Sequence, residues 1–153
     1  MTKTGSSTLL LSLGDRESRV RLTGEDGVSR EFVLALGLDA MTPGPFRRDP
    51  PTPLELEQAI MVVEDVLMPL AAHVPPHPLV ELHSPVPLAE VLGSRVQSRE
   101  NIERLFGQLV AMVEGDPLAS AQLPRDRRFA AALLILREWM HHLDAGSVAL
   151  VDQ

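Results

Sequence analysis

The first third of the chain alternates apolar and polar residues with a period of two. Val20 and Leu22, for example, alternate with Arg19 and Arg21. This period predicts strands with one buried face. Three runs show it, separated by turn residues such as Gly14-Asp15: residues 9–13, 18–23 and 28–36. Connections this short join antiparallel neighbours, so the pattern predicts a three-stranded antiparallel meander.

Apolar residues later recur at spacings of three and four, which is typical of amphipathic helices. Three segments show this spacing: residues 53–70, 99–113 and 125–143. The first begins with a capping box, in which Thr52 is the N-cap, Pro53 occupies the first helical position and Glu55 reaches back. The last is apolar around most of its circumference, which predicts a central place in the fold or an interface.

The remaining segments predict shorter elements. Leu79 to His83 is a candidate extended segment, and Leu88 to Leu92 forms one or two helical turns closed by Gly93. Ser147 to Val151 predicts a fourth strand that returns to the sheet. We therefore expect a single α+β domain over residues 1–153. It has a small antiparallel β-sheet, made of the meander with this C-terminal strand as a candidate fourth member, packed against about three α-helices.

Composition narrows the class of protein. The chain has 153 residues, a formal net charge of −7 and no cysteine, which excludes disulfides and thiolate metal sites. There is no run of about 18 apolar residues that would span a membrane. Clustered basic and aromatic residues, as nucleic-acid binding requires, are also missing. These features predict a soluble, cytoplasmic protein with no nucleic-acid or membrane partner.

The candidate metal ligands are three histidines and a carboxylate within eleven residues: His73, His77, Glu81 and His83. Imidazole and carboxylate groups suit zinc or a related divalent ion. On an extended segment, Glu81 and His83 point to the same side. Pro75 and Pro76 exclude a helix between the first two histidines, and the competing interpretation is a loop of exposed histidines.

A candidate anion site lies where the last helix begins, at Arg125, Arg127 and Arg128. Backbone N–H groups at a helix N-terminus and nearby guanidinium groups favour a phosphate or carboxylate. The alternative is a solvated charged turn, because Asp126 partly neutralises the cluster.

Other charged residues receive structural interpretations. His141-His142 suits the negative end of the last helix dipole. The carboxylates on the first helix read as surface groups: Glu55, Glu57, Glu64 and Asp65.

No catalytic motif stands out in the sequence, because nucleophile elbow, phosphate-binding glycine loop and zincin patterns are all absent. The main functional hypothesis is a non-catalytic protein-interaction or adaptor module, and not an enzyme. The alternative is a small metal-dependent or anion-binding enzyme or sensor that uses the His73–His83 loop or the Arg125–Arg128 turn. Surplus apolar residues on two of the predicted helices, together with Val33 and Ala35 on the sheet, predict a homodimer.

Overall fold

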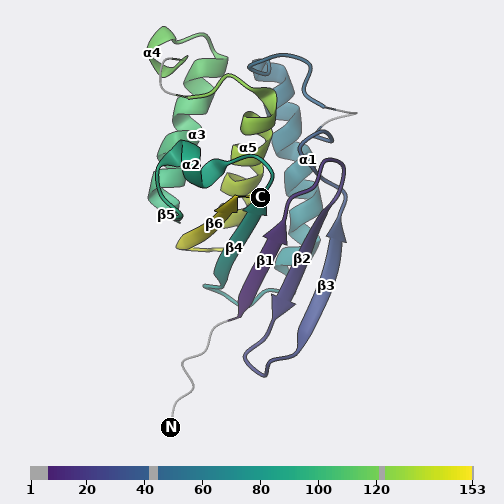
Figure 1. The fold of residues 1–153 in the computed structure, drawn as a ribbon. Coiled ribbons are helices and arrows are strands. Elements are labelled where there is room, and N and C mark those ends of the chain that lie inside the picture. Colours follow the sequence, from purple (N-terminus) through teal and green to yellow (C-terminus); the bar gives the residue numbers. More distant parts are fainter. Residues whose placement is uncertain (1–6, 42–44, 121–122, 153) are drawn as a thin grey trace.

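The chain folds into one mixed β-sheet with helices against it (Figure 1). The computed structural model describes residues 7–41, 45–120 and 123–152. In these ranges the strands are β1 (Thr8–Ser12), β2 (Ser18–Thr23), β3 (Ser29–Leu34), β4 (Leu79–Ser84), β5 (Val96–Ser98) and β6 (Ser147–Asp152). The helices are α1 (Pro53–Ala71), α2 (Leu88–Leu92), α3 (Arg99–Val113), α4 (Pro117–Ser120) and α5 (Arg127–His142).

The strand order is β3-β2-β1-β4-β6-β5. β1, β2 and β3 form an antiparallel meander, whereas β1, β4 and β6 are parallel neighbours, and β5 closes the far edge antiparallel to β6. β4 lies beside β1, and β6 lies beside β4 on its other side, so both crossovers advance toward the same edge of the sheet. Because such crossovers are right-handed, α1 and α5 cover the same face of the sheet. Figure 1 shows both helices on that side, with α3 beside α5.

The core lies between this face and the helices. Leu11, Leu82 and Leu150 stand on adjacent strands in register, and all three are fully buried or nearly so. From Phe129 to Leu136 every residue of α5 is buried, as is Trp139 further along. The prediction of a central helix is therefore confirmed.

The predicted fold class was wrong. The sheet has six strands and mixed direction, not a small antiparallel arrangement, and the described ranges hold five helices rather than about three. The antiparallel meander is present, and the C-terminal strand does return to the sheet, but β6 pairs with β4 in parallel. Long connections that contain helices separate these strands: β2, β3 and α1 lie between β1 and β4, and α2, β5, α3, α4 and α5 lie between β4 and β6. Such connections permit parallel pairing that local periodicity does not reveal.

Several local predictions are confirmed. At the start of α1 the Glu55 N–H donates to the Thr52 hydroxyl at 3.1 Å, and the Thr52 N–H donates to the Glu55 carboxylate at 3.0 Å. Gly93 closes α2 with a φ of 82°.

No described helix is long and apolar enough to cross a membrane.

The opposite face of the sheet carries a different set of side chains. Its residues alternate with the core positions along each strand and include Leu10, Arg21, Glu31 and Glu81. Val33 is 58% exposed on β3. The predicted homodimer, with a partner over this residue, stays a prediction.

Candidate functional site

The carboxyl ends of the parallel strands β1, β4 and β6 meet at one edge of the sheet, which we call the carboxyl edge. In open α/β sheets this edge is where ligands bind. β3 also ends at this edge. Both α1 and α5 begin beside it (Figure 1). The carboxyl edge therefore brings together strand ends, two helix N-termini and the loops between them.

The turn between β1 and β2, residues 13–17, projects from this edge. The Leu38 N–H donates to the Gly14 carbonyl at 3.0 Å, and the Asp39 N–H donates to the Asp15 carbonyl at 2.7 Å. A Cβ on Gly14 would lie 2.2 Å from the Glu17 carbonyl oxygen, and one on Gly37 would lie 2.5 Å from that of Asp15. Both positions thus require glycine, and the turn is locked onto the segment that follows β3.

Arg128, at the start of α5, fastens the same two segments through side chains. Its guanidinium donates to Asp39 at 2.7 Å and to Asp15 at 2.9 Å. The hydrogen bond to Asp15 raises the pKa of Arg128, burial opposes it, and the contact with Asp39 reinforces it. Arg128 is therefore charged at any working pH and is shared between two carboxylates.

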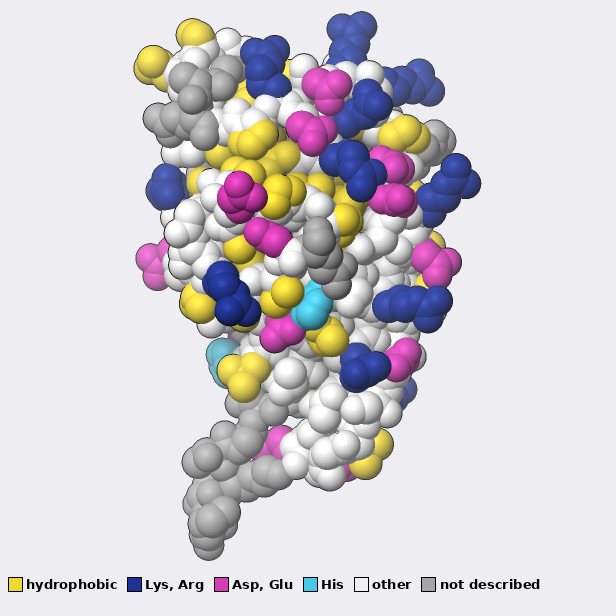
Figure 2. Space-filling model, in the orientation of Figure 1, with side chains coloured by type: hydrophobic (Ala, Val, Ile, Leu, Met, Phe, Trp, Pro, Cys, Tyr) yellow, Lys and Arg dark blue, Asp and Glu magenta, His cyan; other side chains and the backbone are white. Residues whose placement is uncertain are grey.

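The other arginines of the predicted anion site lie close by in the chain and have different surroundings. The Arg127 N–H donates to Asp49 at 2.7 Å, and its guanidinium stands 3.7 Å from the same carboxylate. Arg125 is exposed. Figure 2 shows Arg side chains along the upper part and one side of the molecule, interleaved with Asp and Glu. Arg16, in the β1–β2 turn, is exposed and forms no ion pair with the described residues.

The carboxylate of Asp152, at the end of β6, occupies the start of α2. It accepts hydrogen bonds from the N–H groups of Ala89 at 2.9 Å and Glu90 at 3.1 Å. The chain itself thus supplies an anion at this corner of the carboxyl edge.

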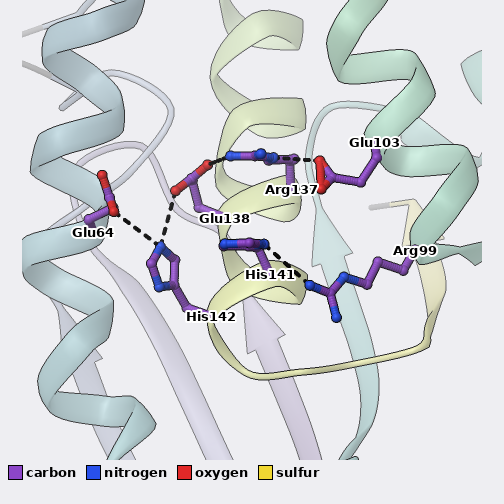
Figure 3. A network of polar contacts seen from close by, with 7 residues as sticks. All are labelled: Glu64, Arg99, Glu103, Arg137, Glu138, His141 and His142. Atoms are coloured by element: carbon purple, nitrogen blue, oxygen red, sulfur yellow. Dashed lines mark hydrogen bonds and ion pairs between the residues drawn. The ribbon is translucent and has the colours of Figure 1, made fainter.

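A second polar group lies between α1 and the C-terminal half of α5 (Figure 3). His142 Nε2 lies 3.3 Å from Glu138 Oε1 and 3.5 Å from Glu64 Oε2. Ligand atoms of these three residues lie within 4.8 Å of one another, so they form a carboxylate–histidine cluster that could hold a metal ion. The Glu138 side chain is 1% exposed.

Arg137 compensates the buried charge of Glu138. Its Nη1 donates to Glu138 Oε2, and its Nε donates to Glu103 on α3 at 2.6 Å. Burial works to lower the pKa of Arg137, but these two hydrogen bonds outweigh it and raise the pKa. Beside this group, Arg99 bridges His141 and Asp144 at 3.2 Å each.

The histidine-loop residues do not come together as one group. Glu81 and His83 are in direct contact, as the period-two geometry predicted. Their side chains lie on the open face of the sheet. His73 packs against the Phe32 ring at 5.7 Å on the helix-covered face, and His77 pairs with Asp144 at 3.5 Å. Metal binding by these residues stays a prediction.

The sequence interpretation missed the cluster of Glu64, Glu138 and His142. Glu64 is 39% exposed but meets an imidazole, so it is more than a surface carboxylate. One signal was available: Glu138 and His142 are four residues apart on an apolar helix, where a carboxylate needs a partner. The contribution of Glu64 depends on how α1 packs against α5, which local sequence does not encode.

The fold and edge geometry define an α/β domain with an antiparallel meander on one side of a parallel centre. No family model matches the chain, and no curated protein does. Solved structures do: the Ppx/GppA phosphatase of Aquifex aeolicus (type II variant) superposes with a TM-score of 0.70 at 16% identity, over 96% of this chain and 53% of that one. An exopolyphosphatase from Cytophaga hutchinsonii gives 0.67 at 16%, over 97% and 54%. The chain spans about half the length of these structures.

This likeness corrects our functional hypothesis. The neighbours are enzymes of the phosphatase class, which contradicts the expectation of a non-catalytic protein-interaction module that is not an enzyme. Identities this low establish the fold alone. The alternative in our sequence interpretation, an anion-binding enzyme, agrees better with the likeness.

Proposed function

We propose that this chain is a phosphate-binding domain of the Ppx/GppA phosphatase type, which takes a polyphosphate-like substrate at the carboxyl edge. The observation that carries the proposal is the β1–β2 turn, fixed at the end of β1 by Gly14 and Gly37. A rigid turn at this edge positions backbone N–H groups and side chains for a ligand before the ligand arrives. The class of substrate comes from the solved structures with this fold, among them an exopolyphosphatase.

The charges at the carboxyl edge support a polyanionic ligand. Guanidinium groups bind phosphate oxygens in pairs and stay charged. Arg16 has no internal ion pair among the described residues, whereas Arg128 would have to exchange Asp15 or Asp39 for a phosphate oxygen. We therefore expect Arg16 to contact the phosphate group directly. The ion pairs of Arg128 with Asp15 and Asp39 then hold the β1–β2 turn in position.

The experiment measures binding and turnover separately on the full chain. Tripolyphosphate binding is followed by calorimetry at low ionic strength, and phosphate release from long-chain polyphosphate by a colorimetric assay. Arg16→Gln is compared with Arg30→Gln, a matched exposed arginine near the start of β3, at the other end of the sheet. We expect Arg16→Gln to weaken binding about tenfold, because it removes one charge-assisted hydrogen bond.

Two outcomes would contradict the proposal. One is a wild-type chain that neither binds tripolyphosphate at millimolar concentration nor releases phosphate. The other is an equal loss of binding in both variants, which would mean that only general charge is sensed. Binding without phosphate release would support the proposed anion site and contradict the proposed phosphatase activity.

A further inference from the structure

We propose that Glu64, Glu138 and His142 form a binding site for a divalent transition-metal ion that joins α1 to α5. This site is separate from the carboxyl edge and does not depend on the proposed function. Glu138 and His142 are one helical turn apart on α5 and face the same way, and Glu64 meets them from α1 (Figure 3). Nothing in the histidine loop contributes to it.

Two distances within the cluster are longer than a charge-assisted hydrogen bond and close to the separation of two ligands on one metal ion. A charge-assisted N–H···O bond measures about 2.7–2.9 Å. The imidazole nitrogen instead stands 3.3 Å and 3.5 Å from two carboxylate oxygens. Ligands about 2.0–2.1 Å from a tetrahedral ion are separated by about 3.3–3.4 Å from each other. The distances from the His142 nitrogen to the two carboxylate oxygens therefore match the spacing of ligands around a tetrahedral ion, and all three ligand atoms lie within 4.8 Å of one another.

The surroundings leave one oxygen of Glu138 for the ion. Arg137 and His142 contact different atoms of this carboxylate, because Arg137 donates to Oε2 whereas His142 faces Oε1. Arg137 is anchored in turn by Glu103. Such outer partners fix the orientation of metal ligands in proteins. The buried Glu138 carboxylate is thus already turned toward the site.

Charge and chemistry select the kind of ion. Two carboxylates, from Glu103 and Glu138, share the single guanidinium of Arg137, and Glu64 adds a third carboxylate beside His142, so a dication reduces an excess of negative charge. An imidazole nitrogen with two carboxylate oxygens favours zinc and its neighbours over calcium or magnesium. Glu64 at 39% and His142 at 19% exposure leave a path for the ion and for a water ligand.

The neighbouring histidine provides a matched control. His141 stands next to His142 in the sequence, and their rings touch edge to face with centroids 5.2 Å apart. Its Nδ1 faces Arg99 instead of the cluster. Replacing His141 therefore changes the same helix turn without removing a ligand.

The experiment uses the tag-free full chain, treated with chelator and dialysed. Zinc affinity is measured by calorimetry, Co²⁺ binding by visible absorption, and the melting temperature with and without zinc. The variants are Glu64→Gln, His142→Ala, His141→Ala and the double variant His77→Ala/His83→Ala. We expect stoichiometric binding in the wild type with tetrahedral Co²⁺ bands, and a rise in melting temperature of about 5 °C or more in excess zinc.

The variants decide the assignment. Glu64→Gln and His142→Ala should weaken zinc binding at least tenfold, and both should lose the zinc-dependent rise in melting temperature. Circular dichroism shows whether each variant is folded, and Glu64→Gln, the more exposed change, keeps the test valid if His142→Ala does not fold. His141→Ala and the loop double variant should bind as the wild type does. Absence of binding in the wild type, unchanged binding in Glu64→Gln, or loss in the loop variant would overturn the proposal.

Discussion

The two ends of α5 carry the same kinds of charged groups in opposite settings. At its N-terminal end Arg128 meets Asp15 and Asp39, which come from loops and whose side chains are 63% and 35% exposed. Toward its C-terminal end Arg137 meets Glu138, whose side chain is 1% exposed. Hydrated carboxylates can release an arginine to another anion at small cost, whereas a buried carboxylate cannot lose its partner. The first setting suits an exchangeable ligand, and the second suits a fixed one.

The largest effect should follow from removing the cation at the buried end. Arg137→Met leaves the Glu138 carboxylate without its guanidinium, in a place that water does not reach. We expect the free energy of unfolding, measured by urea denaturation, to fall by about 3 kcal/mol. The Arg137 aliphatic stem and its stacking on Phe106, 5.1 Å from the ring centroid, contribute a smaller part.

A double variant separates charge from packing. Arg137→Met/Glu138→Gln removes both charges, so most of the lost stability should return, because no uncompensated charge stays buried. If the double variant is as unstable as the single one, packing rather than charge holds this end of α5. The two ends of α5 would then not differ in how much their stability depends on charge.

A smaller effect is expected at the exposed end. Arg128→Met breaks two ion pairs, but Asp15 and Asp39 regain water, so the loss should be about 1 kcal/mol or less. High salt sharpens the comparison. At 1 M salt the exposed pairs are screened, and the difference between wild type and Arg128→Met should shrink, whereas the Arg137→Met difference should persist. Equal salt sensitivity in both variants would count against the assignment.

The sequence correctly predicted the structural features that depend on residues adjacent in the chain. The α1 cap follows from Thr52, Pro53 and Glu55 alone, and Gly93 ends α2 by its backbone freedom. The parallel pairs of β1 with β4 and of β4 with β6 depend on residues far apart along the chain, which periodicity does not register. β5 has three residues, too few to show a period at all.

The two polar sites also combine features that are visible in local sequence with features that depend on tertiary structure. Arg127 and Arg128 were recognisable as a cluster because they are adjacent in sequence, but their partners Asp15, Asp39 and Asp49 come from distant loops. The cluster at Glu64, Glu138 and His142 needs the packing of α1 against α5. Two of its members were visible as an i,i+4 pair. The third is supplied only by tertiary structure, which is why the sequence pointed to the histidine loop instead.

The smallest effect concerns the capping box beside the exposed end of α5. Burial works to raise the pKa of Glu55, but hydrogen bonds from the N–H groups of Thr52 and Arg47 outweigh it and lower the pKa below its ordinary 4.5. A lowered pKa in the folded state contributes stability above the unfolded value, and this contribution disappears as pH falls through the folded value. Glu55→Ala should therefore cost about 0.5 kcal/mol at pH 7.

The pH dependence tests whether the charge of Glu55, and not its helix propensity, carries this effect. Urea denaturation between pH 7 and pH 3 should show the gap between wild type and Glu55→Ala narrowing below pH 4.5. Glu57→Ala, an exposed neighbour outside the capping box, is the control and should change stability by a few tenths of a kcal/mol at most. A gap that stays constant with pH would mean that the carboxylate contributes no charge-dependent bond, and that Thr52 alone caps α1.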